Sequence, residues 1–112
     1  MSDSETRLAD RSCVPCRGGV PPLDDEQIGR LLAQLDGWRV RDKHDLQKEY
    51  AFPDFATALA FVNRVGEVAE REGHHPDVLL SWGRVRLQVW THKIDGLSES
   101  DFVFDAKADA VL

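Results

Sequence analysis

The feature that most constrains the fold is a long apolar pattern at helical spacing, which stops at a glycine and a proline. Segment 54–72 has apolar residues three and four positions apart, which predicts an amphipathic helix. Its apolar stripe consists of Phe55, Leu59, Val62, Val65 and Ala69, widened by Ala58, Phe61 and Val68. Asp54 is a natural N-cap after Pro53, and Gly73 stands where a helix commonly ends. Pro76 then prevents the helix from resuming.

Segments at strand spacing lie on both sides of this helix. Segments 77–82 and 84–92 are joined by a turn at Gly83, which predicts a hairpin. In the second segment one face carries Val85, Leu87, Val89 and Thr91, and the other carries Arg84, Arg86, Gln88, Trp90 and His92. This alternation predicts a core face and an open face. Two earlier segments, 38–42 and 46–52, are separated by a short connection and predict a second hairpin.

Two shorter helices complete the pattern. One is expected over 24–35 with Asp24 or Asp25 as its cap, and one over 99–112 with Ser98 and Asp101 as a capping box. The order α-β-β-α-β-β-α, with short turns between strands, predicts an α+β fold: a four-stranded antiparallel sheet with helices packed on one face. The large groups on the open face, such as Trp90, predict that a second subunit covers it.

The length of 112 residues predicts one domain, which we place at 23–112. Residues 1–22 are rich in polar residues, glycine and proline, and we expect an irregular N-terminal extension. The net charge of −6 argues against nucleic-acid binding through a general basic surface. No apolar run is long enough to span a bilayer, and the N-terminus lacks the apolar region of a secretory signal. We therefore expect a cytoplasmic protein.

The two cysteines, Cys13 and Cys16, form a CxxC pair inside the extension. Two cysteines in a chain without a secretory signal do not indicate a disulfide framework. A zinc site needs four ligands and the chain has no second CxxC, so histidines or another subunit would have to complete one. The alternative is a tail with incidental thiols.

A group of histidines is the candidate site. His74 and His75 lie just beyond the predicted helix 54–72, and Glu70 lies one turn upstream, where it can accept a hydrogen bond from an imidazole. The hairpin around Gly83 should bring His92 back beside them. Three imidazoles that titrate near neutrality could then donate one proton and accept another. The fourth histidine, His44, is expected to be a surface group in a turn.

Structural interpretations remain open for several of these residues. Three histidines can bind a metal ion, although adjacent His74 and His75 are poorly placed to chelate one ion together. The capping position of Asp101 explains that residue without any chemistry. Trp82 and Trp90 fit a subunit interface or the core as well as they fit a substrate contact.

The spacing of these residues resembles the signature of the pterin-4a-carbinolamine dehydratases. The pattern is Glu-x-x-x-His-His-Pro from Glu70, then Trp82, His92 and Asp101. "DGW", "DFATALAFVNRV" and "WTHKIDGLSESDF" resemble the same family, so the resemblance runs from about residue 24 to the C-terminus.

The resemblance implies loss of water from 4a-hydroxytetrahydropterin, giving quinonoid dihydropterin, in tetrahydrobiopterin recycling. It implies no metal or redox cofactor, an aromatic amino acid hydroxylase as metabolic partner, and a homodimer or homotetramer. The implied catalytic residues are His74, His75 and His92, with His74 and His92 as the acid–base pair and His75 orienting the pterin. Substrate contacts are expected from Glu70, Gly73, Trp82, Trp90 and Thr91, and structural roles from Pro76 and Asp101.

Two alternatives are carried forward. Relatives with this pattern include assembly or dimerisation factors, so the fold alone does not prove an activity, and a catalytically silent factor of the same fold is the first alternative. The other alternative is a metal-binding protein that uses Cys13 and Cys16.

Overall fold

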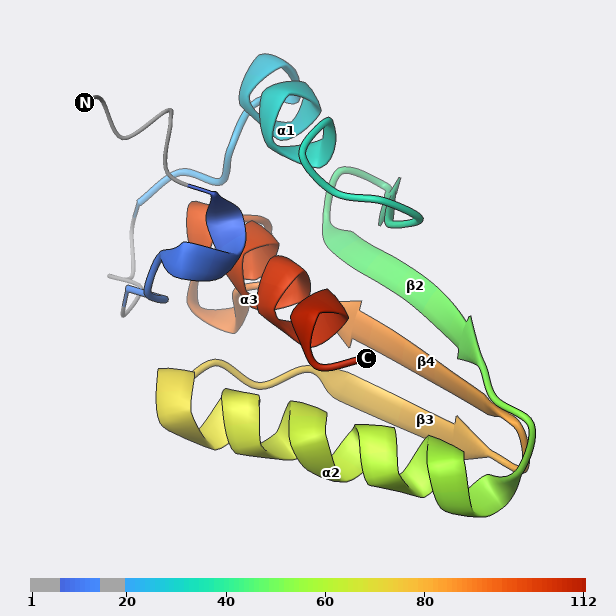
Figure 1. Ribbon diagram of the computed structural model, residues 1–112. Helices are drawn as coiled ribbons and strands as arrows, with labels where there is room; N and C mark the ends of the chain where they lie inside the picture. Colours follow the sequence, from blue (N-terminus) through green and yellow to red (C-terminus); the bar gives the residue numbers. More distant parts are fainter. Residues whose placement is uncertain (1–6, 15–19) are drawn as a thin grey trace.

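The computed structural model describes residues 7–14 and 20–112 (Figure 1). Its helices and strands are, in chain order, η2 (Leu8–Asp10), α1 (Asp25–Leu32), β1 (Arg39–Arg41), β2 (Asp45–Ala51), α2 (Phe55–Glu72), β3 (Asp77–Ser81), β4 (Arg84–Val89), η3 (His92–Ile94) and α3 (Glu99–Ala110). The predicted order α-β-β-α-β-β-α is confirmed, and the described residues add two short 3₁₀ helices. No helix in the described part of the chain is long and apolar enough to cross a membrane.

The four strands form one antiparallel sheet in the order β1-β2-β4-β3. The two hairpins predicted from the sequence therefore meet through their later strands, β2 and β4. Gly83 makes the tight turn of the second hairpin, where an added Cβ would lie 2.9 Å from the Phe52 carbonyl oxygen. The sheet is open at two edges, β1 and β3.

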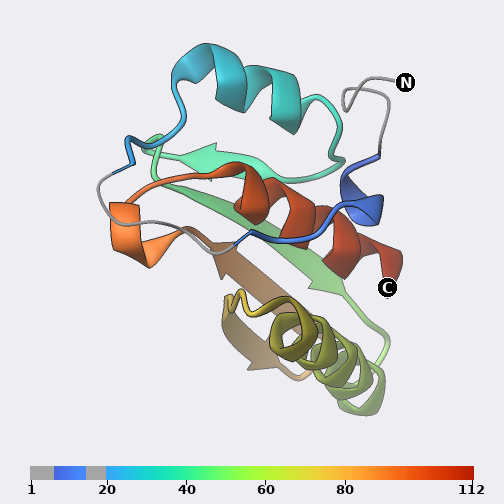
Figure 2. The same cartoon turned by 90° about the vertical axis from the view of Figure 1, so that its left-hand side faces the viewer.

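The helices cover one face of this sheet, as predicted (Figure 2). The covered face carries alternate residues of the two central strands, and these are fully buried or nearly so: Leu46, Tyr50, Val85, Leu87 and Val89. They pack against buried side chains of α2 and α3, including Phe61, Val65, Phe102 and Phe104. The uncovered face carries four arginines, Arg39, Arg41, Arg84 and Arg86, together with Leu79. It is more polar than the sequence led us to expect.

The buried side of α2 differs from the predicted stripe. Its buried residues are Ala58, Phe61, Val65, Val68 and Ala69, whereas Phe55 is 44% exposed and Leu59 is 39% exposed. The helix lies over β3 and β4 at one edge of the sheet, so only the side that faces α3 and the strands is covered. The buried side is therefore centred on the residues that widened the predicted stripe, Ala58, Phe61 and Val68, together with Val65 and Ala69.

Both ends of α3 are held by hydrogen bonds to aspartate side chains of the helix. Near its C-terminus the Asp109 carboxylate accepts hydrogen bonds from Trp38 Nε1 at 3.0 Å, from Lys48 Nζ at 3.0 Å and from the Tyr50 hydroxyl. At its N-terminus the predicted capping box is present, and the Ser98 N–H donates to Asp101 Oδ2 at 2.8 Å. This second end belongs to the candidate site.

Candidate active site

The site begins where α2 ends. Gly73 adopts a left-handed backbone with φ of 67°, which glycine tolerates without steric cost, and its N–H closes the helix on the Ala69 carbonyl. His74 N–H also reaches the Ala69 carbonyl, at 3.2 Å. The chain then turns through Pro76 into β3, so His74 and His75 are held at a fixed corner between helix and strand.

His74 is bound to a buried carboxylate. Its Nε2 lies 2.6 Å from Asp101 Oδ1, and Asp101 is 0% exposed. The other carboxylate oxygen accepts from Thr91 Oγ1 at 2.9 Å and from the Ser98 N–H. The Thr91 hydroxyl and the Ser98 N–H both donate to Oδ2, which suits an ionised carboxylate, because that form can only accept hydrogen bonds. The His74 Nε2 must therefore carry the proton. Among the described residues no group is hydrogen-bonded to Nδ1 of His74.

His75 is held differently. Its Nε2 is hydrogen-bonded to the Glu70 carboxylate, and the sequence predicts such a pairing for an imidazole near this residue. Both side chains are largely open to solvent, at 60% for His75 and 79% for Glu70. The His75 ring is thus held by one hydrogen bond at the surface of the protein.

His92 does not end a strand, because β4 stops at Val89 and His92 begins η3. Its ring packs on Trp90, with centroids 4.3 Å apart, and Trp90 in turn packs on His44 at 5.3 Å. This stack is exposed on the His92 side and partly buried at Trp90.

His44 is more than the surface group that we expected. Its two ring nitrogens lie 2.9 Å from Asp45 Oδ2 and 2.7 Å from Asp95 Oδ1. These hydrogen bonds, first to Asp45 and then to Asp95, raise the pKa of His44 above its ordinary value. His44 thus ties the β1–β2 turn to the loop that follows His92. Sequence reasoning missed this because Asp95 is 51 residues away.

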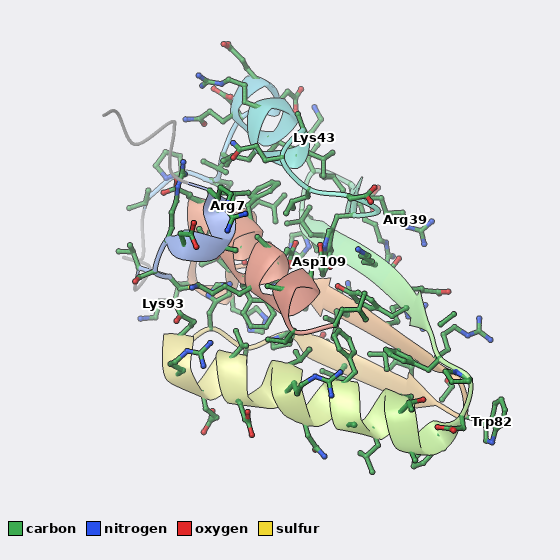
Figure 3. All side chains as sticks on the ribbon, in the orientation of Figure 1. Arg7, Arg39, Lys43, Trp82, Lys93 and Asp109 are labelled. Carbon is green, nitrogen blue, oxygen red and sulfur yellow. The ribbon has the colours of Figure 1, made fainter. Side chains whose placement is uncertain are left out.

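The predicted convergence is present in part. The register of Asp77 with Gln88, continued past the strand ends, would set His74 opposite Thr91, the neighbour of His92. The shared hydrogen bonds to Asp101 join His74 and Thr91. In the described part of the chain the three imidazoles do not contact one another. Trp82 lies apart, 70% exposed at the far tip of the β3–β4 hairpin, and points away from the body (Figure 3).

Of the two cysteines, only Cys13 has a described position, because Cys16 lies outside the described residues. The Cys13 Sγ is 3.5 Å from the Ser100 carbonyl, and burial and the nearby Glu72 carboxylate raise the pKa of the thiol to about 12. A thiol of this kind is a poor metal ligand because the thiolate is the binding form. Within residues 7–14 and 20–112, no three His, Cys, Asp or Glu side chains are grouped to hold a metal ion.

Comparison with known proteins adds to this geometry. Residues 21–111 match the model of the family described as "Pterin 4 alpha carbinolamine dehydratase". A protein of Rubrobacter xylanophilus, named "Putative pterin-4-alpha-carbinolamine dehydratase", is 58% identical over 104 residues, which are 93% of this chain and 97% of that protein. A protein of Alkaliphilus metalliredigens with the same name is 53% identical over 103 residues, 91% of this chain and 93% of that protein. Both matches take in part of the segment before residue 21.

Two solved structures share the fold. The transcriptional coactivator/pterin dehydratase from Brucella melitensis has a TM-score of 0.76 and 30% identity, and the match covers 80% of this chain and 97% of that one. A pterin dehydratase-like protein identified as a RuBisCO assembly factor in the alpha-carboxysome has a TM-score of 0.59 and 26% identity, covering 67% and 88%.

Proposed function

Because the chain belongs to the pterin-4a-carbinolamine dehydratase family, we propose that it dehydrates 4a-hydroxytetrahydropterin to quinonoid dihydropterin. The observation that carries this proposal is the His74 ring, whose Nε2 is held by the buried Asp101 carboxylate while Nδ1 has no hydrogen-bond partner among the described residues. A carboxylate that holds one imidazole nitrogen sets the tautomer and stabilises the imidazolium once the other nitrogen takes a proton.

The reaction needs one proton delivered and one removed. The 4a-hydroxyl group is protonated and leaves as water, the C4a–O bond breaks, and the N5 lone pair forms the new C4a=N5 bond as N5 loses its proton. No electrons enter or leave. We assign the two transfers to His74 and His92, and binding of the pterin to His75. General acid–base help of this kind contributes about 10²- to 10⁴-fold.

The remaining assignments follow from position. Glu70 orients His75, Thr91 shares Asp101 with His74, and Trp90 supports the His92 ring. We propose that the Gly73 backbone and the Trp90–Thr91 edge shape the pterin pocket, and that Asp101 joins the site as the group that orients His74. The proposed setting is tetrahydrobiopterin recycling in the cytoplasm, with an aromatic amino acid hydroxylase as metabolic partner and a homo-oligomer as the working form.

The direct test is dehydration of freshly generated carbinolamine by the purified protein. We expect His74→Ala and His92→Ala each to lower kcat by about 10²-fold or more, since each removes a proton-transfer group. Asp101→Asn should also lower kcat, because an amide NH₂ can face the ring and favour the wrong tautomer. Asn63→Ala, on the exposed side of α2, is the control and should match the parent. If both histidine variants were as fast as the parent, the assignment would be wrong.

A second function is favoured by one comparison. The RuBisCO assembly factor shows that a protein of similar fold can serve assembly, and the same role here would need the fold without turnover. This alternative predicts no acceleration over the spontaneous reaction and a stable complex with a partner protein. A third alternative, metal binding through Cys13 and Cys16, is tested by elemental analysis of protein purified without a His-tag.

A further inference from the structure

Residues 8–14, here called the N-terminal strap, lie against α3 (Figures 1 and 2). Leu8 is 3% exposed and belongs to the core cluster. Lys107 Nζ donates to the Ala9 carbonyl at 2.9 Å, and Arg11 forms an ion pair with Glu99. The strap is therefore anchored at one end by an apolar side chain and along its length by charged groups of α3.

The other end of the strap joins two elements of the candidate site. The Cys13 N–H donates to Glu72 Oε1 at 2.9 Å, and Glu72 is the last residue of α2. The Val14 N–H donates to Ser100 Oγ at 2.8 Å, and the same hydroxyl donates to the Val14 carbonyl at 3.1 Å. Two consecutive strap residues thus hold the C-terminal end of α2 and the first turn of α3 together.

These two attachment points flank the His74–Asp101 pair. Glu72 precedes His74 by two residues, and Ser100 directly precedes Asp101. The hydrogen bond between His74 and Asp101 spans the same gap between α2 and α3 that the strap closes from outside. Asp101 is fully buried and the His74 side chain is 14% exposed, so neighbouring atoms restrict the movement of both side chains. If the two helix ends moved apart slightly, the hydrogen bond between them would therefore lengthen.

Glu72 is the central contact of the strap. Its side chain is 11% exposed, and besides the Cys13 N–H it faces Arg71 Nε at 3.6 Å and Lys107 Nζ at 3.9 Å. The hydrogen bond from Cys13, with help from these cations, lowers the pKa of Glu72, so it is ionised at neutral pH. Hydrogen bonds to an ionised acceptor are stronger than those between neutral groups.

We propose that the N-terminal strap, through Glu72 and Ser100, is a positioning device that sets the separation of His74 and Asp101. Glu72 and Ser100 are then positioning residues, which touch no substrate and act through the His74–Asp101 hydrogen bond. The kinetic part of this inference rests on the proposed dehydratase function, whereas its structural part does not. The extension that the sequence placed outside the catalytic domain is, on this view, part of the catalytic apparatus.

The test compares Glu72→Ala, Glu72→Gln and Ser100→Ala with the parent. The first readout is the low-field proton NMR signal of the His74 Nε2–H, which reports its hydrogen bond to Asp101. We expect this signal to shift or broaden in Glu72→Ala and Ser100→Ala and to return in Glu72→Gln, whose amide oxygen can still accept from the Cys13 N–H. The matched control is Arg7→Ala, which removes only an exposed ion pair with Asp10 and should leave the signal unchanged.

The second readout is steady-state kinetics. Misplacement of a catalytic group costs rate more than binding, so we expect kcat to fall roughly ten-fold or more in Glu72→Ala, with a smaller change in KM and recovery in Glu72→Gln. A role confined to stability would lower the melting temperature and leave kcat unchanged. If folded Glu72→Ala and Ser100→Ala both keep the parent's His74 signal, the proposal is overturned. If the parent itself does not dehydrate the carbinolamine, the proposed function fails and the NMR signal alone decides the role of the strap.

Discussion

Asp105 is a fully buried carboxyl group in the middle of α3, and neither of its oxygens has a hydrogen-bond partner among the described residues. It lies one turn from Asp101 and one turn from Asp109. Burial, with the negative charges of Asp101 and Asp109 adding to it, raises the pKa of Asp105 well above its ordinary value. The group is therefore more readily protonated in the folded chain than in the unfolded one.

This shift makes stability depend on pH with a definite sign. Because the folded pKa of Asp105 is raised, the stability that its protonated form allows is complete below the unfolded pKa of ~3.9 and is lost as pH rises through the folded pKa. Between the unfolded and the folded pKa of Asp105, this group alone lowers the free energy of unfolding by about 1.4 kcal/mol per pH unit.

Asp105→Asn should remove this dependence. We expect urea unfolding of the variant to give a free energy that declines less between pH 4 and pH 7 than that of the parent, since Asn does not ionise. Asp36→Asn, at an exposed site, is the control and should follow the parent. Equal slopes for the parent and Asp105→Asn would show that Asp105 does not bind an extra proton on folding.

At the scale of elements, the end of α2 determines where the two adjacent histidines lie. Gly73 stops the helix in a left-handed conformation, Pro76 fixes the following turn, and the strand starts at Asp77. Gly66 lies in the interior of the same helix, where an added Cβ would meet no atom within 4 Å. Gly66 can therefore be replaced by a residue with a side chain, whereas Gly73, which caps the helix, needs the left-handed backbone that favours glycine.

Gly73→Ala and Gly66→Ala form a matched pair. At Gly73 an alanine must adopt a positive φ, which we expect to cost about 1 kcal/mol and to disturb His74. At Gly66 an alanine should stabilise the helix by about 0.5–1 kcal/mol, because it restricts the unfolded chain and suits a helix interior. Thermal or urea unfolding of the two variants measures whether each change raises or lowers the free energy of unfolding. A stabilised Gly73→Ala protein would contradict the capping role.

At the scale of the whole molecule, the described residues leave one face and two edges of the sheet uncovered. The edge strand β3 carries Leu79 on the open face, 49% exposed, opposite Arg86 of the neighbouring strand β4. Edge strands with exposed apolar side chains are sites where a second chain can pair. This feature supports the predicted homo-oligomer, whereas the many arginines of the face limit how apolar such an interface can be.

We expect the parent to sediment as a dimer or tetramer at micromolar concentration. Leu79→Glu should shift it towards the monomer, because a carboxylate would lose its hydration in the interface. Val20→Glu is the control, since Val20 has the same exposure of 49% but belongs to no strand. A parent that is monomeric at this concentration would exclude the oligomer, and an unchanged Leu79→Glu protein would place the interface elsewhere.

The sequence by itself determined the features that depend on near neighbours in the chain. Caps and breakers such as Asp54, Gly73 and Ser98, and the two-residue alternation of the last strand, gave the order of elements and the antiparallel sheet. Such signals are local because a helix cap or a turn involves residues three or four positions apart. The spacing of the histidines likewise identified the family without the structure, and Glu70 could be paired with an imidazole because it lies on the same helix end.

Only the tertiary structure decided what lies across from each element. Asp101 meets His74 from 27 residues away, and the Cys13 N–H meets Glu72 from 59 residues away. The packing of α2 also leaves Phe55 and Leu59 exposed, although the helical pattern placed both on the apolar stripe. Contacts of this kind depend on how whole helices pack, and a periodic pattern gives the width of an apolar side but not its exact rotation against a neighbour. The tautomer of His74 follows from its contact with Asp101, so no local sequence pattern could predict it.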